Sequence, residues 1–179
     1  MTLLVAVAVV LVFEAEVAKP YEIPTSSMEP TLHCARPGNG CRATFSDRVL
    51  VNRLAYRFRD PRRGDVVVFE APTTAVARCG AGGAYVKRIV GLPGDTVRMT
   101  HGYVSIDGKP LDESAYIRSG VQRGAASGIW KVPSGRFFLL GDNRNDSCDS
   151  RTWGSVARSS LIGPIAATYR PPERIRIDH

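Results

Sequence analysis

The stretch AYVKRIVGLPGD, residues 84–95, predicts the unit from which the fold is built, a short apolar strand that ends in a turn. Valine, isoleucine and tyrosine favour strands, whereas the GLPG segment at 91–94 favours a turn. The stretch DPRRGDVVVFEAP, residues 60–72, has the same plan, with a turn over 61–64 and a buried strand over 66–69. The chain is therefore expected to alternate short strands with tight turns.

The same pattern continues on both sides of this centre. Residues 47–58 predict a strand that leads into a turn, 95–100 and 103–111 predict further strands, and 137–140 predict a short buried strand. The Asp-Gly pair at 107–108 is a strong signal for a two-residue hairpin. Strands about ten residues apart, joined by turns, indicate a mainly β fold, an antiparallel sheet or barrel.

Two segments lack the strand pattern. Residues 71–84 are small and glycine-rich, which predicts a loop, and residues 113–128 are polar and small, which predicts a surface excursion. We find no internal repeat and no long amphipathic helix. Residues 19–179 are expected to form one β-domain with a small excursion at about 109–130.

The composition is that of an ordinary globular protein. Of 179 residues, 44% are hydrophobic and 23% are charged, and 17 glycines and 12 prolines agree with many turns. The formal net charge of +7 suits either nucleic acid or anionic lipid. No DNA-reading or RNA-reading motif accompanies the scattered basic residues, so a nucleic-acid partner is not expected.

An almost wholly apolar run, TLLVAVAVVLVF, occupies residues 2–13. Twelve residues are fewer than the roughly 20 that span a bilayer core, and Glu14 and Glu16 follow. A membrane anchor, a cleaved secretory segment and a buried core segment are the three alternatives. The absence of a basic residue before Lys19 disfavours a signal peptide. We therefore expect residues 1–18 to be a transmembrane anchor.

The four cysteines lie at positions 34, 41, 79 and 148. No C-x-x-C pair occurs and the three histidines are dispersed, so no metal site is expected. The stretch CARPGNGC, residues 34–41, could close as a small disulfide loop, which would leave Cys79 with Cys148. Four cysteines allow three connectivities, and four free thiols are the other alternative.

The candidate nucleophile lies in IPTSSMEPTL, residues 23–32, where two adjacent hydroxyls, Ser26 and Ser27, stand between two prolines. Proline restricts its own φ and biases the preceding residue to an extended conformation, so a rigid strand-and-turn is expected. By itself this stretch is more typical of a serine-rich loop.

Lys87 is the candidate base. On a strand it shares a face with Tyr85 and Ile89, so its amine either reaches water or is buried. Burial lowers the pKa of a lysine and makes it usable as a base. The stretch GDNRNDSCDSR, residues 141–151, follows an apolar strand and brings carboxylates, arginines and hydroxyls to the mouth of the sheet.

Together these stretches resemble the type I signal peptidases, a family of serine proteases with a Ser–Lys dyad. The resemblance covers most of residues 20–165, in the order in which the family carries its conserved boxes. The matching stretches are IPTSSMEPTL, DRVLVNRLAYRF, RRGDVVVF, YVKRIVGLPGD and GDNRNDSCDSR.

The resemblance implies a catalytic role for two residues, Ser27 as the nucleophile, because it directly precedes the methionine, and Lys87 as the general base. Thr25 is implied as an oxyanion donor and Ser147 as the hydroxyl that orients the lysine amine. Such a lysine must be neutral near pH 7, so its pKa must fall far below the usual value of about 10.4.

Supporting positions follow from the same resemblance. Asp149 and Arg151 are implied as a supporting ion pair, and Ile23, Met28 and Tyr85 are candidates for substrate-binding walls. Apolar surface near Met28 is a candidate for contact with lipid.

The implied function is membrane-bound removal of N-terminal signal peptides from secreted preproteins, after a small-x-small site and through an acyl-enzyme. No cofactor is implied. The expected partners are signal peptides and membrane lipid, and the chain is expected to be a monomer. It is expected in the cell membrane as a single-pass protein with an extracytoplasmic catalytic domain. The alternatives are an inactive membrane-tethered binding module and a self-cleaving repressor-type Ser–Lys protease.

Overall fold

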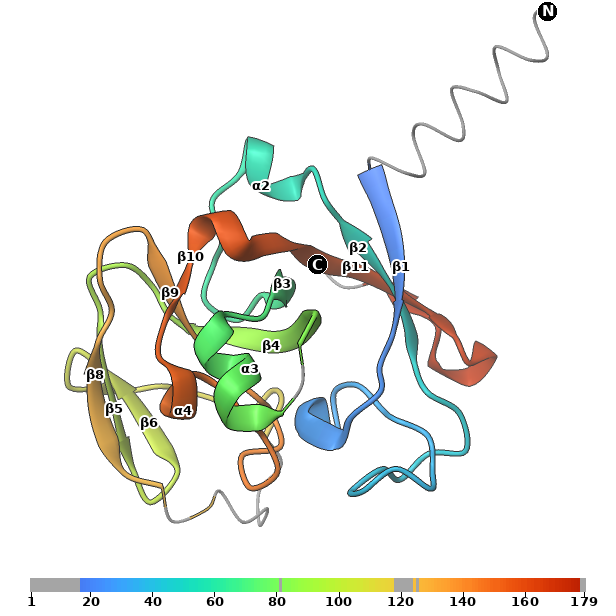
Figure 1. Ribbon diagram of the computed structural model, residues 1–179, viewed down its shortest axis with the longest axis horizontal. Helices are drawn as coiled ribbons and strands as arrows, with labels where there is room; N and C mark the ends of the chain where they lie inside the picture. Colours follow the sequence, from blue (N-terminus) through green and yellow to red (C-terminus); the bar gives the residue numbers. More distant parts are fainter. Residues whose placement is uncertain (1–16, 81, 118–123, 125, 178–179) are drawn as a thin grey trace, which may run out of the picture.

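The computed structural model describes residues 17–80, 82–117, 124 and 126–177 (Figure 1). Residues 1–16 of the expected anchor lie outside this part of the chain. Within it, no helix is long and apolar enough to cross a membrane. The first strand begins at Ala18, which is the last residue of the expected anchor.

The larger of two sheets has eight strands, and all of its recorded pairings are antiparallel. In spatial order its main path runs through β1 (Ala18–Glu22), β2 (Arg48–Asn52), β11 (Leu161–Arg170), β3 (Val66–Glu70), β4 (Ala84–Gly91), β9 (Arg136–Leu140) and β10 (Val156–Ala157). The short strand β12 (Arg176–Ile177) pairs with β11 off this path. The mainly β, antiparallel fold expected from the sequence is confirmed.

The smaller sheet lies at one end of the molecule (Figure 1). Its order is β7 (Lys109–Pro110), β6 (Tyr103–Ile106), β5 (Thr96–Thr100) and β8 (Gly128–Lys131). Asp107 and Gly108 connect β6 to β7 with φ values of 50° and 81°. Two successive residues with positive φ make the hairpin turn that an Asp-Gly pair favours, which confirms this prediction.

Helical segments are short. They are the 3-10 turns η1 (Ser26–Met28), η2 (Arg158–Ser160) and η3 (Pro172–Arg174), and the α-helices α2 (Ala55–Phe58), α3 (Thr73–Cys79) and α4 (Ser150–Trp153).

Helix α3 corrects the expectation of a loop over 71–84. Pro72 precedes its first turn, Gly80 ends the helix at φ 73°, and Ala75 is its buried residue. A proline before a helix and a left-handed glycine after it are start and stop signals. The glycine-rich composition obscured these signals.

Both faces of the central strands are buried, which explains their continuous apolar runs. In β9, Phe137 and Leu139 pack in one hydrophobic cluster with Val67 of β3, whereas Phe138 and Leu140 pack in a second cluster. A third cluster includes Val68 of β3 together with residues of β2 and of the segment around η1. A strand that is buried on both faces loses the alternation of apolar and polar residues.

Two disulfides tie loops to this framework. They join Cys34 to Cys41 and Cys79 to Cys148, so the structure selects one of the three possible connectivities. The second disulfide connects the end of α3 to the polar loop that follows β9.

Candidate active site

The turn that carries Ser27 is held by the core beneath it. Thr25 precedes η1 with an extended backbone, φ −132° and ψ 156°, and the chain then closes the single turn Ser26–Met28. Ile23 and Met28 are only 2% and 1% exposed and pack against buried valines of β2 and β3. Buried side chains on both sides of Ser26 and Ser27 therefore hold the serine pair in position.

The burial of Met28 corrects the expectation that it contacts lipid. Its side chain, like that of Ile23, points into the third hydrophobic cluster rather than to the surface. Ile23 and Met28 therefore hold the turn that carries Ser27 against the hydrophobic core.

The amine of Lys87 meets the hydroxyl of Ser27. Lys87 lies in β4, opposite Val67 of β3, and is 4% exposed. Its Nζ donates hydrogen bonds to Ser27 Oγ at 2.7 Å and to the carbonyl oxygen of Val86 at 2.9 Å. The ring of Tyr85 lies 5.7 Å from Nζ, measured to the ring centroid. The side chain of Lys87 is thus the part of strand β4 that meets the turn Ser26–Met28.

Burial lowers the pKa of Lys87 to about 8. Removal of water disfavours the charged amine, and this effect outweighs the opposing attraction of Asp149 and Asp142, while Arg151 adds to the lowering. The pKa falls less far than the value near 7 that the resemblance requires. A neutral amine is nevertheless well populated in mildly alkaline solution.

Thr25 lies at the open side of this pair. Thr25 is exposed to solvent, and its Oγ1 is 3.3 Å from Ser27 Oγ. A hydroxyl in this position can donate to an oxygen that develops negative charge beside the nucleophile.

The loop after β9 clamps the serine turn. The backbone N–H of Asn143 donates to the carbonyl oxygen of Ser27 at 3.1 Å, and its side-chain Nδ2 donates to that of Ser26 at 3.1 Å. Ser26 Oγ donates to the Asp146 carboxylate. Ser26 is therefore used to hold the loop, which separates its role from that of its neighbour.

Asn143 was not among the residues expected from the sequence. Two asparagines occur in the loop, and only the folded position shows which of them reaches the serine turn. Gly141 was also missed: a Cβ there would lie 2.5 Å from the carbonyl oxygen of Ser27 and 2.2 Å from Ser147 Oγ. Glycine at this position allows the close approach of loop and turn.

Asp149 and Arg151 form the expected ion pair. Arg151 Nε donates to Asp149 Oδ1 at 2.7 Å, and the fully buried carboxylate also accepts the N–H of Gly141 at 3.1 Å. Asp149 caps α4 by accepting the backbone N–H of Arg151, so both residues of the ion pair belong to the start of this helix.

Ser147 does not contact the lysine amine as the resemblance implied. Its Oγ is buried and has no hydrogen-bond partner among the described residues, because Lys87 Nζ is directed to Ser27 and to the carbonyl of Val86. The carbonyl of Ser147 instead accepts a hydrogen bond from Arg151 at 3.1 Å.

A second buried ion pair fixes the loop from the opposite face of β4. Arg88 donates to the two carboxylate oxygens of Asp142 at 2.8 and 2.7 Å, and its guanidinium lies 4.0 Å from the centre of the Tyr116 ring. Lys87 and Arg88 are neighbours in the strand, so this bidentate contact holds the loop close to the lysine.

A buried hydroxyl beside a lysine of lowered pKa, on a rigid antiparallel scaffold, is the arrangement of a serine peptidase that uses lysine as its base. A sequence profile described as "Signal peptidase, peptidase S26" matches residues 1–170 of this chain. The chain therefore belongs to the signal peptidase family, whose type I members are serine endopeptidases.

Two individual relatives agree with this family. A probable signal peptidase I-2 of Synechocystis sp. is 40% identical over 97% of this chain and 73% of its own length. A signal peptidase I of Leptolyngbya laminosa is 39% identical over 97% of this chain and 79% of its own. A crystal structure of a signal peptidase I from Enterococcus faecalis is 31% identical, with a TM-score of 0.48, and covers 59% of this chain and 97% of that one.

Proposed function

We propose that this chain is a membrane-bound type I signal peptidase that cleaves signal peptides from secreted preproteins after a small-x-small site, such as Ala-x-Ala. The observation that carries this proposal is the 2.7 Å hydrogen bond from Lys87 Nζ to Ser27 Oγ, made by a buried amine whose pKa is lowered to about 8.

In the proposed reaction, neutral Lys87 accepts the proton of Ser27 as Oγ attacks the scissile carbonyl carbon. Collapse of the tetrahedral intermediate breaks the peptide bond, and Lys87 returns the proton to the departing amine. The amine of Lys87 then deprotonates a water molecule that attacks the acyl carbon, and it returns this proton to Ser27 Oγ as the ester bond breaks, which releases the carboxylic acid and restores the neutral lysine.

The oxyanion is proposed to be held by the backbone N–H of Ser27 and by the hydroxyl of Thr25. Support comes from Thr25 Oγ1, which lies 3.3 Å from the nucleophilic oxygen and belongs to an exposed residue. Donors that are already in place stabilise negative charge without reorganisation during the reaction.

The substrate is proposed to bind as an extended strand beside the dyad, with small side chains in shallow pockets. Tyr85 remains a candidate for a pocket wall, because it is half-buried and its ring packs edge-on against the ring of Phe69. The two ring centroids are 6.1 Å apart. Ile23 and Met28 support such a wall from below.

The apolar segment that precedes β1 is proposed as the single membrane anchor, with the β-domain on the extracytoplasmic side as a monomer. The two disulfides support that compartment, because disulfides persist where the environment is oxidising. An anchor next to the nucleophile turn would place the site at the lipid surface, where signal peptides are found.

The deciding experiment is cleavage of a preprotein with an Ala-x-Ala site by the full chain in non-ionic detergent. Ser27→Ala and Lys87→Met are each expected to abolish cleavage. Ser26→Ala, the matched control, loses only its hydrogen bond to Asp146 and is expected to keep most of the activity.

Three outcomes would reject the proposal. Full activity in either dyad variant would remove Ser27 and Lys87 from the chemistry. A wild-type chain that binds the preprotein without cleaving it would be a binding module. Cleavage confined to the chain itself would indicate a self-processing protease.

A further inference from the structure

A basic cleft lies on the face of β4 that is opposite Lys87. Arg88 contributes to its wall, and successive side chains of a strand point to opposite faces, so the cleft is separate from the serine–lysine pair. Its volume is about 890 Å³, within the range of small-molecule sites.

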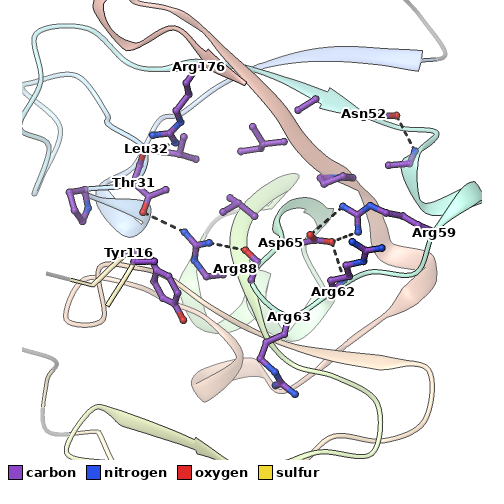
Figure 2. A pocket seen from close by; sticks show the side chains of 18 of the residues that line it. Thr31, Leu32, Asn52, Arg59, Arg62, Arg63, Asp65, Arg88, Tyr116 and Arg176 are labelled. Atoms are coloured by element: carbon purple, nitrogen blue, oxygen red, sulfur yellow. Dashed lines mark hydrogen bonds and ion pairs between the residues drawn. The ribbon is translucent and has the colours of Figure 1, made fainter. Parts of the chain in front are cut away.

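The lining of the cleft is rich in arginine. Five of its lining residues are arginines and only one, Asp65, is a carboxylate. The arginines are Arg59, Arg62, Arg63, Arg88 and Arg176. Figure 2 shows Arg59 and Arg62 on one side of the cleft and Arg88 and Arg176 on the other.

Three of these arginines are held in place by carboxylates. Arg59 pairs with Asp65 at 2.7 Å, Arg63 with Asp95 at 3.1 Å, and Arg88 with Asp142 at 2.7 Å. The paired carboxylates thus orient the guanidinium groups.

Arg62 differs from these three. It is exposed, and its guanidinium makes no hydrogen bond or ion pair with another described residue, although its backbone N–H donates to Asp65 at 3.0 Å. The backbone of the turn is therefore fixed while the charged group remains available at the mouth of the cleft.

Neutral polar residues complete the wall, namely Thr31, Asn52, Ser114 and Tyr116. The hydroxyls of Thr31 and Tyr116 already donate to Asp142 and Glu113, so Asn52 is the neutral residue whose donor capacity matters here. The Oδ1 of Asn52 accepts two backbone N–H groups at 3.0 Å, which leaves its amide NH₂ as a donor. Guanidinium groups combined with neutral donors recognise phosphate oxygens, because the planar guanidinium matches their geometry with two parallel hydrogen bonds.

We propose that this cleft binds a phosphate-bearing anion, with Arg62 as the principal charged contact. The phosphate could belong to a lipid headgroup or to a soluble compound, since the recognition chemistry is the same. This site is independent of the proposed peptidase activity, and its test does not use cleavage.

The first arm titrates the full chain in non-ionic detergent with inorganic pyrophosphate by calorimetry at low salt. The second arm measures co-sedimentation with phosphatidylglycerol vesicles, and phosphatidylcholine vesicles serve as the neutral reference. Arg62→Glu is compared with Arg98→Glu, which makes the same charge change at an exposed position of β5 outside the cleft. Arg62→Gln is a milder variant, and thermal unfolding checks that each variant is folded.

We expect Arg62→Glu to weaken binding at least tenfold and Arg98→Glu to change it less than twofold. Binding of pyrophosphate would identify a soluble ligand class, and binding only of phosphatidylglycerol vesicles would identify lipid. Equal weakening by both variants would show a diffuse effect of surface charge and overturn the proposal. Absence of binding in both arms would overturn it as well.

Discussion

The amine of Lys87 lies 2.7 Å from the hydroxyl oxygen of Ser27, although the two residues are 60 positions apart in the sequence. The contact is buried, and the loop at 141–151 closes over it through Asn143. Strand β4, which carries Lys87, and the turn η1, which carries Ser27, therefore meet at this polar contact. The contact and its surroundings lead to four predictions.

The first prediction concerns pH. Because Lys87 must be neutral to accept a proton and its pKa is lowered to about 8, kcat/KM should rise with pH through about 8 and then level off. The measurement is a pH–rate profile of preprotein cleavage with substrate far below KM. A rate that continues to rise toward the pKa of an ordinary lysine, about 10.4, would contradict the burial of the amine.

The second prediction concerns the carboxylate that opposes this lowering. The negative charge of Asp149 raises the pKa of Lys87, and Arg151 lowers it. Asp149→Asn removes the first effect and leaves the charge of Arg151 unpaired, so both changes shift the midpoint of the profile to lower pH. Asp60→Asn, at an exposed position, should leave the midpoint in place.

The midpoint does not depend on how much active enzyme is present. A variant of Asp149 that is less stable can therefore still be tested through its folded fraction. A shift to higher pH would show that Asp149 does not act on Lys87 through its charge.

The third prediction concerns Thr25. If its hydroxyl binds the oxyanion, Thr25→Val should lower kcat roughly 100-fold or more with little change in KM, because the contact forms only in the transition state. Thr25→Ser keeps the hydroxyl and should retain most of the activity. A valine variant with normal kcat would show that the hydroxyl of Thr25 does not bind the oxyanion.

The fourth prediction compares the two disulfides. Cys79 and Cys148 are separated by 69 positions and Cys34 and Cys41 by 7. In the chain-entropy model, replacing both cysteines of a pair by serine lowers the free energy of unfolding by about 4 kcal/mol for Cys79–Cys148 and by about 2 kcal/mol for Cys34–Cys41. Urea unfolding measures the two differences.

Activity distinguishes the same two variants. Cys148 lies between Ser147 and the buried Asp149, so loss of the longer-range disulfide should also lower kcat, because it frees the loop that clamps Ser27. Loss of the Cys34–Cys41 disulfide should have the smaller effect on kcat. The reverse order would mean that the loop at 141–151 is held well enough by its hydrogen bonds alone.

Much of the fold could be predicted because strands and turns have local signals. The VVVF run at 66–69, the FFLL run at 137–140 and the Asp-Gly turn at 107–108 all lie in the expected structures. Helix α3 was missed because glycines and small residues are shared by loops and by short capped helices. The packing of Ala75 against the core, which the sequence does not show, distinguishes the two.

The candidate site was predictable to a different degree at each residue. Ser27, Lys87 and the pair of Asp149 and Arg151 were found because their neighbouring residues resemble a known family. Asn143 and Gly141 were not found, because a hydrogen bond to a distant carbonyl and a close backbone approach leave no pattern in neighbouring residues.

The sequence by itself determined most of the strands and turns and singled out the side chains proposed to react, because these signals depend on neighbouring residues. The tertiary structure decided which groups meet and in which environment. It placed Met28 in the core, left the hydroxyl of Ser147 without a hydrogen bond to the lysine amine, and gathered arginines from three separate segments into one cleft. These relationships depend on burial and on contacts between distant segments, and burial is also the physical cause that lowers the pKa of Lys87.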